Sequence, residues 1–446
     1  MSCRILRLTL FFCFLVPAFS CGGGGSTPAV QPTPAPQQIE PPAAWVAYIR
    51  QQAHPLQSID PANVDYSDLA FLAPLLEGRN IVELGESCHG VAEFSQAKIR
   101  LIKYLHEQLG YDVIAFESSI LSTYLANEQS SHSTPTAFMD DSIPPVWHTT
   151  DVVKLFSYIQ STLSTAHPLI LAGFDVQLTS NYEAQARPGI FKEVVGQVDP
   201  AYAQQVYETD QAFVNGSYLN SYILANYATL KPAYQALTDF LDAHMTQIQN
   251  AYPTRPLFPL VVRQAAWGTG VYLDELYDSA SNNQAAADNA RDPGMASNLE
   301  LLIDKLYAGK EIMVWAHNAH IVHDATTVFG WGGWNNMGSF IFQKYGQAVY
   351  TLGLYMYQGS AANNDGSIFA IPPAADYSVE GLLHSTGDPY ALTDLSTVTS
   401  ANDSTAWMFQ KFSIRDSGII NSSMTLKDEY DGLLQIDTVH PPTYVN

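Results

Sequence analysis

The chain has 446 residues, of which 47% are apolar and only 14% are charged, a balance typical of a globular protein and not of a disordered one. Its formal net charge of −23 makes nucleic acid or an anionic membrane surface an unfavourable partner. No G-x-G-x-x-G, G-x-x-x-x-G-K or G-x-S-x-G sequence follows an apolar run, so neither a nucleotide-binding loop nor a serine nucleophile elbow is indicated.

The first predicted element is an N-terminal export signal. Arg4 and Arg7 precede the apolar run 8–19, which is shorter than a membrane-spanning helix. The run ends at Ala18-Phe-Ser-Cys21, which resembles a bacterial lipobox with Cys21 as the lipidated residue. The alternative is a cleaved secretory signal followed by a disordered start.

The lipobox pattern divides the chain into three predicted segments. They are a signal peptide over 1–20, a lipid-anchored Gly/Pro-rich tether over 21–44, and a globular domain over 45–446. We therefore expect a bacterial envelope lipoprotein that is held at the membrane through Cys21 and faces the periplasm or the cell surface. Gly22 lacks the carboxylate that accompanies inner-membrane retention, which favours the outer membrane.

Five apolar runs bounded by turn residues predict buried strands. They are residues 80–85, 111–116, 168–173, 311–316 and 348–355. Their length and β-branched content are typical of strands buried on both faces, as in parallel sheets. Between them, apolar residues recur at helical spacing over 92–109 and 151–163. The sequence therefore predicts an α/β fold in which a three-layer, mostly parallel sheet is flanked by helices.

The interval 182–288 interrupts this alternation. It contains no convincing strand, and its stretches 230–252 and 257–277 are long, Tyr-rich and amphipathic. We expect a helical insertion or cap and not an independent domain. Residues 289–306 then return to the core as a helix that leads into the fourth strand.

Side chains that can ionise or transfer protons follow four of the five predicted strands. They are Glu86 with His89, Glu117, Asp175, and His317 with His320. Because ligands bind beyond the carboxyl ends of strands in open parallel sheets, we expect these side chains to meet in one site.

Glu86 and His89 are the leading acid–base pair. A His serves as a general base near neutral pH, and a neighbouring carboxylate sets its tautomer. The structural alternative is a capping cluster at the start of the helix that begins near Ala92.

His317, His320 and His323 have H-x-x-H spacing, which places imidazoles on one face of a helix. They predict either a shared proton network or, together with Glu86 and His89, a divalent metal site. The alternative is a single imidazole in the site with the others packed or capping, and His323 is the expected bystander. Cys88, beside His89, is predicted to be a packed thiol and not a nucleophile.

Several ordered motifs resemble those of the erythromycin esterase family. Leu84-Gly-Glu-Ser-Cys-His-Gly90 is similar to its L-G-E-[AS]-x-H-G signature, and Val314-Trp-Ala-His-Asn-Ala-His320 matches V-W-A-H-N-x-H. Gly173-Phe-Asp175 resembles the family's G-F-D segment, and Arg291-Asp292 begins a stretch similar to R-D-x-x-M-A-x-N. The resemblance extends from about residue 65 to the C-terminus.

This resemblance implies a hydrolase that uses water directly, without a nucleophile from the enzyme. The best-known members open the lactone ring of macrolide antibiotics, which implies a role in antibiotic resistance. Carried over to this sequence, His89 is the general base and Glu86 orients it. The substrate is a small-molecule ester or lactone, and no cofactor is implied.

The remaining roles are also carried over from the resemblance. Glu117, His317 and His320 complete a network for water and the oxyanion, and Lys98 supplies positive charge to the developing oxyanion. Substrate contacts are expected from Asp175, Arg291 and Trp315.

Two alternatives stay open at this point. One is an enzyme on the same scaffold that acts on another envelope-associated substrate, with a metal at Glu86, His89 and His320. The other is a non-catalytic lipoprotein that binds a hydrophobic ligand. Retention of Glu86, His89, Glu117 and His320 disfavours simple binding, because unpaired buried ionisable groups cost stability without a chemical role.

Overall fold

A computed structural model describes residues 40–328, 330 and 332–445. The predicted signal peptide, Cys21 and nearly all of the predicted tether lie outside the described residues. Helix α1 (Ala43–Gln52) begins at residue 43, so it includes the last two residues of the predicted tether. Its Trp45 stacks on Tyr377 and meets the edge of Phe412, so the globular part of the chain includes this helix.

The main sheet is mixed and mostly parallel, which confirms the predicted fold class. Its strands run in the order β1 (His54–Pro55), β8 (Tyr390–Asp394), β11 (Gly432–Val439), β6 (Val349–Ala362), β2 (Ile81–Leu84), β5 (Ile312–Trp315), β3 (Val113–Ser119) and β4 (Ile170–Asp175). Every pair from β11 to β4 is parallel. Strands β1 and β8 add antiparallel pairs at one edge, and β7 (Ile368–Ile371) pairs antiparallel with β6.

The sheet separates two hydrophobic cores, because successive side chains of a strand point to opposite faces. Leu84, Phe116 and Trp315 belong to one core, whereas their neighbours Ala115 and Val314 belong to the other. All of these side chains are almost completely buried. Burial on both faces explains why the strands read as continuous apolar runs in the sequence.

Helices cover both faces, which gives the three predicted layers. On one face α3 (Ala92–Tyr104) and α6 (Thr150–Thr162) share a core with the sheet. Helix α3 ends through a π-helical turn at Gly110, whose φ of 84° is the left-handed conformation that glycine adopts readily. On the other face lie α4 (Ile120–Gln129), α11 (Gln284–Leu301) and α13 (Met337–Tyr345).

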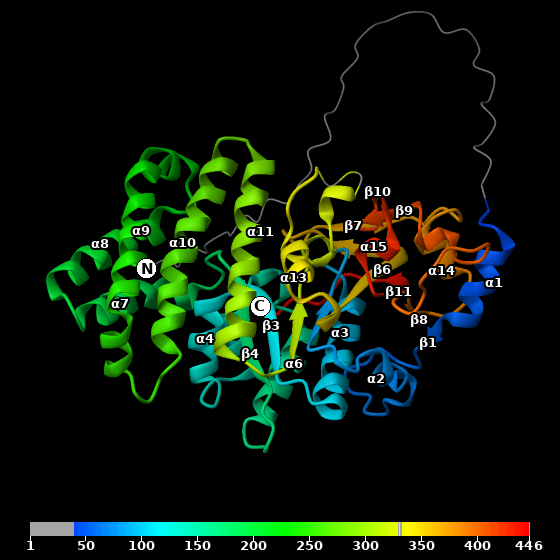
Figure 1. Cartoon of the computed structure of the whole chain (residues 1–446), viewed down its shortest axis with the longest axis horizontal. Coiled ribbons are helices and arrows are strands. Elements are labelled where there is room, and N and C mark those ends of the chain that lie inside the picture. The colour runs from blue at the N-terminus through cyan, green and yellow to red at the C-terminus, as the bar shows by residue number, and fades with distance from the viewer. Residues whose placement is uncertain (1–39, 329, 331, 446) are drawn as a thin grey trace, which may run out of the picture.

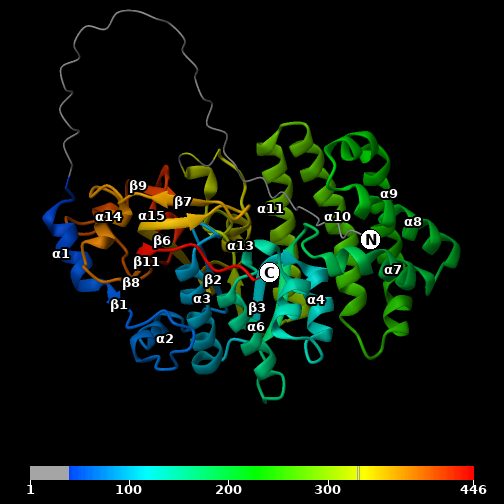
Figure 2. The same ribbon diagram turned by 180° about the vertical axis from the view of Figure 1, so that it is seen from behind.

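The predicted helical insertion consists of four helices and contains no strand. They are α7 (Asn181–Gly196), α8 (Pro200–Gly216), α9 (Asn220–Ala251) and α10 (Phe258–Ala280). Figures 1 and 2 show them together at one end of the molecule, opposite α1 and the C-terminal strands. Helix α10 leads into α11, which brings the chain back onto the sheet beside β4.

Most of the C-terminal region was not predicted from the sequence. Strands β9 (Lys411–Asp416) and β10 (Ile420–Thr425) form a separate two-stranded sheet, and α14 (Val379–His384) packs near them. Within residues 40–328, 330 and 332–445, no helix combines the length and the apolar character needed to cross a membrane.

Candidate active site

A cavity of about 430 Å³ lies at the carboxyl ends of the central parallel strands. The loops and helices that follow β2, β3, β4 and β5 contribute to it, as the position of ligand sites in open parallel sheets predicts. Its polar lining includes His89, Glu117, Arg291, His317, His320 and Asp416. Pro144, Val146, Phe369, Ile419 and Ile420 form an apolar part of the wall.

His89 and Glu86 form a hydrogen-bonded pair at the end of β2. Nδ1 of His89 lies 2.6 Å from Oε1 of Glu86, and Glu86 is completely buried whereas His89 lines the cavity. Since the carboxylate can only accept, Nδ1 carries the proton of the neutral imidazole. Nε2 is then left with a free lone pair, the form of histidine that removes a proton from water.

Buried donors hold Glu86 in its charged form. Lys98 Nζ lies 2.7 Å from Oε2, and the indole N–H of Trp147 donates to Oε1 at 2.9 Å. Burial alone would raise the pKa of Glu86, but Lys98 and His89 hold it below its ordinary value. Glu86 therefore remains an acceptor for His89 at neutral pH.

Lys98 lies behind Glu86 and not in the cavity. Its side chain is fully buried, with Nζ 4.3 Å from the centroid of the Trp315 ring. Burial lowers the pKa of Lys98 to about 8, although Glu86 opposes this effect. The lysine therefore acts on Glu86, whereas the family resemblance implied that its charge would lie at the oxyanion.

The turn that carries His89 depends on a close backbone approach. Gly90 forms a β-bridge with Ala362, and a Cβ atom at position 90 would come within 1.9 Å of the Ala362 carbonyl oxygen. A residue with a side chain would therefore push the His89 turn away from the sheet. This explains the glycine that follows the histidine.

His317 presents the opposite tautomer to His89. It is the N-cap of the short helix α12 (Asn318–Ile321), and its Nδ1 accepts the Ala319 backbone N–H at 3.2 Å. A backbone N–H can only donate, so the proton of the neutral ring is on Nε2. Burial and the neighbouring imidazoles lower the pKa of His317 to about 3. His317 is therefore a neutral hydrogen-bond donor beside His89, with ring centroids 5.2 Å apart.

His320 lies between two carboxylates and is charged. Its Nδ1 is 2.8 Å from Asp292 Oδ1, and its Nε2 is 3.3 Å from Glu117 Oε1. Burial alone would lower the pKa of His320, but Asp292 and Glu117 raise it to about 10. Because both ring nitrogens donate, His320 is not available as a base.

Glu117 is held by three donors at the end of β3. Arg291 reaches Oε1 at 3.0 Å, His320 lies beside the same oxygen, and the backbone N–H of His317 donates to Oε2 at 3.0 Å. Burial alone would raise the pKa of Glu117, but His320 and Arg291 hold it well below the ordinary value. Glu117 therefore fixes α12 and its imidazoles onto β3.

Asp175 orients the Arg291 side chain. Its two carboxylate oxygens accept from Nε and a terminal nitrogen of Arg291 at 3.2 and 2.6 Å, the two-point geometry that arginine favours. Both residues line the cavity. Asp175 thus positions a guanidinium from α11 against the strand ends.

The structure brings most of the predicted site residues to this cavity, but not all of them. His89, Glu117, Asp175, Arg291, His317 and His320 line it, whereas Glu86 and Lys98 lie behind His89. Trp315 is not in the lining, since it is fully buried and stacks on Phe116 in the core. Alternation along β5 turns its side chain toward the α3 and α6 layer.

Three further polar residues at the site had no assigned role. Asp292 falls inside the R-D-x-x-M-A-x-N stretch that carried the family resemblance. Trp147 begins a further stretch, Trp147 to Ile159, that resembles the family's W-x-x-x-[ED]-V helix, so both residues could have been noticed from the motifs around them. Asp416, at the end of β9, had no such signal. Its Oδ1 lies 3.6 Å from Nε2 of His317.

Among the described residues, no three His, Cys, Asp or Glu side chains form a group that could hold a metal ion. Glu86 and Glu117 are already engaged by cationic donors. Cys88 lines the cavity, but burial raises its pKa to about 12, so it is a thiol. His323 lies outside the cavity lining and stacks on Phe342.

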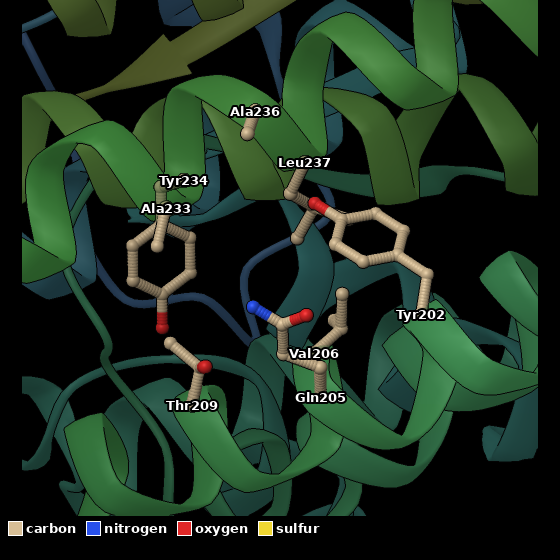
Figure 3. Close-up of a pocket in the computed structure, with 8 residues that line it drawn as sticks. All are labelled: Tyr202, Gln205, Val206, Thr209, Ala233, Tyr234, Ala236 and Leu237. Carbon is tan, nitrogen blue, oxygen red and sulfur yellow. The ribbon is translucent and has the colours of Figure 1, made fainter.

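A second, smaller cavity of about 70 Å³ lies within the helical insertion, between α8 and α9. Figure 3 shows its lining, which includes Tyr202, Gln205, Thr209 and Tyr234. It contains no carboxylate and no imidazole in its wall. Of these two cavities, therefore, only the larger one contains the acid–base residues.

Comparisons of the sequence with known proteins relate the chain to one family of hydrolases. Residues 106–439 match the family model described as Erythromycin esterase. YbfO of Bacillus subtilis (strain 168), which its name classes as a hydrolase, is 31% identical over 419 residues, covering 90% of this chain and 92% of YbfO. Erythromycin esterase type I of Escherichia coli is 31% identical over 128 residues, 28% of this chain and 30% of that protein.

The fold is also found among solved structures. A mutant of erythromycin esterase EreC in its open conformation superposes with a TM-score of 0.69 at 17% identity. The match covers 87% of this chain and 98% of EreC.

Proposed function

The chain belongs to the erythromycin esterase family of hydrolases, and we propose that it opens a carboxylic ester or lactone of a small molecule with a water molecule that His89 activates. The observation that carries this proposal is the pair of His89 and Glu86. Its 2.6 Å contact places the proton of a neutral imidazole on Nδ1, so that Nε2 carries the lone pair, and His89 lines the cavity. In this reaction Nε2 takes a proton from water as the oxygen attacks the carbonyl carbon.

His317 supplies a donor for the oxyanion that develops in this attack. Its Nε2 lies 3.6 Å from Oδ1 of Asp416, a separation that is too long for a hydrogen bond. The Nε2 proton is thus available to a substrate oxygen. An N–H held in place by the α12 cap needs no reorganisation when charge develops, which makes such donors effective.

The cavity fits a drug-sized and partly apolar substrate. A volume of about 430 Å³ lies within the range of small-molecule sites. Phe369, Ile419 and Ile420 offer apolar surface on the side contributed by the C-terminal hairpins, and a macrolide lactone or another hydrophobic ester has this character. The known chemistry of the family supports the same substrate class.

The test is hydrolysis in water enriched in heavy oxygen, with the purified full chain and a panel of macrolides, simple lactones and acyclic esters. We expect one heavy oxygen in the carboxylate of the product. His89→Gln should lower kcat by about 10³-fold, as removal of a general base does. A chelator is added in parallel, and a loss of turnover would assign the activation of water to a metal.

A matched control is His440→Gln. His440 pairs with Glu93 at 2.7 Å but is exposed and does not line the cavity, so this variant should keep the wild-type rate. The proposal is refuted if no ester is opened or if His89→Gln hydrolyses at the wild-type rate. Ligand-induced stabilisation without turnover would instead favour the non-catalytic binding protein.

We also propose that the enzyme acts at the bacterial envelope. The lipobox ending at Cys21 and the Gly/Pro-rich residues that follow support an anchor with a tether. In this location the enzyme would meet its substrate before the substrate enters the cytoplasm.

A further inference from the structure

The hairpin of β9 and β10 brings an acidic side chain to the cavity that the reaction above does not use. Asp416 is the last residue of β9, and Ser417 and Gly418 turn the chain with φ of 51° and 69°. The Ser417 backbone N–H lies 2.9 Å from both the Ser87 carbonyl oxygen and Oδ1 of Asp416. This contact fixes the turn of the hairpin against the segment that carries His89.

Asp416 lacks a cationic partner in the part of the chain that the structure describes. No Lys or Arg pairs with it there, and the basic group that lies within 4.0 Å of it is His317, which is neutral. The side chain is only 13% exposed. An uncompensated carboxyl in such a place favours its protonated form. In agreement, burial raises the pKa of Asp416 to about 7, while the Ser417 N–H and His89 oppose the rise.

The position of Asp416 beside His317 suits a group that acts on the leaving oxygen of the ester. In the tetrahedral intermediate of ester hydrolysis, the oxyanion and the leaving oxygen are bonded to the same carbon atom. They require two donors a few ångströms apart, and the Asp416 carboxyl group lies beside Nε2 of His317, with Oδ1 3.6 Å away and Oδ2 bonded to the same carbon atom as Oδ1. Since Oδ1 already accepts from Ser417, Oδ2 is the atom left to carry the proton.

We propose that Asp416 is a catalytic residue, the general acid that protonates the leaving alkoxide oxygen. This inference rests on the proposed ester hydrolysis and adds the residue that completes it. Three other ionisable groups of the cavity are less suited to this step. His320 and Arg291 are held by carboxylates, and Glu117 is a stable anion.

The proton balance of the step closes without a co-reactant. His89 takes one proton from water, and the resulting hydroxyl group bonds to the carbonyl carbon. When the intermediate collapses, the bond from carbon to the leaving oxygen breaks, and the Asp416 proton passes to that oxygen to give the alcohol. Asp416 is then a carboxylate and His89 an imidazolium, and transfer of the proton from His89 to Asp416 through cavity water restores both.

The test compares two esters of one acid, a 4-nitrophenyl ester and an ethyl ester, with the purified full chain. Nitrophenolate leaves as a stable anion, whereas ethoxide needs a proton. We expect Asp416→Asn to lower kcat for the ethyl ester by about 10²-fold or more. The nitrophenyl ester should change by less than about threefold. His89→Gln should slow both esters, because both need the attacking water.

Asp403→Asn serves as the control, since Asp403 is an exposed Asp in the same C-terminal region, and it should leave both rates unchanged. An equal loss with both esters would show that Asp416 only supports the structure, and two unchanged rates would show that it has no role. Either result overturns the inference. If the wild type opens neither ester nor any other, the proposed function itself fails.

The comparison can still be made if one of the Asp416 variants does not fold. Circular dichroism and thermal melting establish folding of Asp416→Asn, and Asp416→Ala carries the same comparison if the Asn variant is unfolded. Asp416→Glu keeps an acid and should retain much of the ethyl-ester rate. Loss of that rate in a folded Glu variant to the level of Asn or Ala would contradict a role as proton donor.

Discussion

The charged state of His320 is the feature of the site that stability measurements test most directly. We expect His320→Asn to destabilise the protein strongly at pH 6.5 and much less at pH 10. Asn keeps a donor for Asp292 in place of Nδ1 but carries no charge. The variant therefore removes the interaction of the imidazolium with Asp292 and Glu117 while it keeps the shorter hydrogen bond.

The magnitude follows from linkage between protonation and folding. The two carboxylates raise the pKa of His320 from 6.5 to about 10 in the folded protein. A raised folded pKa gives stability that is present in full below the unfolded pKa and lost as pH rises through the folded one. At about 1.4 kcal/mol for each pH unit, the contribution is at most about 5 kcal/mol below pH 6.5 and disappears near pH 10.

The free energy of unfolding must be compared between wild type and variant at each pH, because Lys98 makes the stability of both proteins rise with pH whereas His320 makes it fall. Burial lowers the pKa of Lys98 from 10.5 to about 8, so its destabilising effect is present below pH 8 and is relieved as pH rises toward 10.5. Both proteins retain Lys98, and its effect cancels. Urea denaturation at pH 6.5, 8, 9 and 10 gives the gap in free energy of unfolding.

His323→Asn provides the matched control. Burial lowers the pKa of His323 from 6.5 to about 4, so this imidazole is neutral in the folded protein throughout the range. Its removal should give a gap that varies by less than about 0.5 kcal/mol between pH 6.5 and 10. The reasoning is refuted if the gap for His320→Asn is equally flat. That result would mean that a neutral His320 is hydrogen-bonded between the two carboxyl groups.

Four further predictions concern the base and the cysteines. Glu86→Gln should lower kcat by about 10³-fold or more, because an amide N–H at His89 Nδ1 favours the wrong tautomer; a rate within tenfold of wild type would contradict the assigned orientation. Lys98→Met should cost about 3–5 kcal/mol of unfolding free energy, since it leaves Glu86 buried without its cation, and urea denaturation measures this loss. Cys88→Ser should keep kcat within about threefold, because a packed thiol takes no part in the reaction, and a complete loss in a folded variant would revive a thiol nucleophile. Cys21→Ser should move the protein from the membrane fraction to the soluble fraction and abolish incorporation of labelled palmitate; an unchanged distribution would exclude this anchor.

The strands and the residues at their ends could be predicted because their signals are local. Burial on both faces produces continuous apolar runs, and the carboxyl ends of parallel strands meet at one edge of the sheet. Glu86, Glu117 and His317 are therefore neighbours although they are far apart in the chain. The sequence could not show that Lys98 lies behind Glu86, because the helical positions of α3 do not tell which carboxylate a long side chain reaches.

The role of Asp416 in the site could not be predicted from the local sequence. Asp416 belongs to the sequence Asp-Ser-Gly at the turn between β9 and β10, which has the composition of an ordinary surface turn. What makes it part of the site is the contact of Ser417 with Ser87, a tertiary contact across more than three hundred residues. Local periodicity carries no information about where such a hairpin folds.

The chemistry of the two central imidazoles is likewise decided by their partners and not by their residue type. The rings of His89 and His317 are 5.2 Å apart in one cavity. A carboxylate at Nδ1 of His89 requires a proton there and leaves Nε2 as a base. A backbone N–H at Nδ1 of His317 excludes a proton there and makes Nε2 a donor. Two histidines can therefore play opposite parts in the proposed reaction, the first accepting the proton of water and the second stabilising the oxyanion that this water creates.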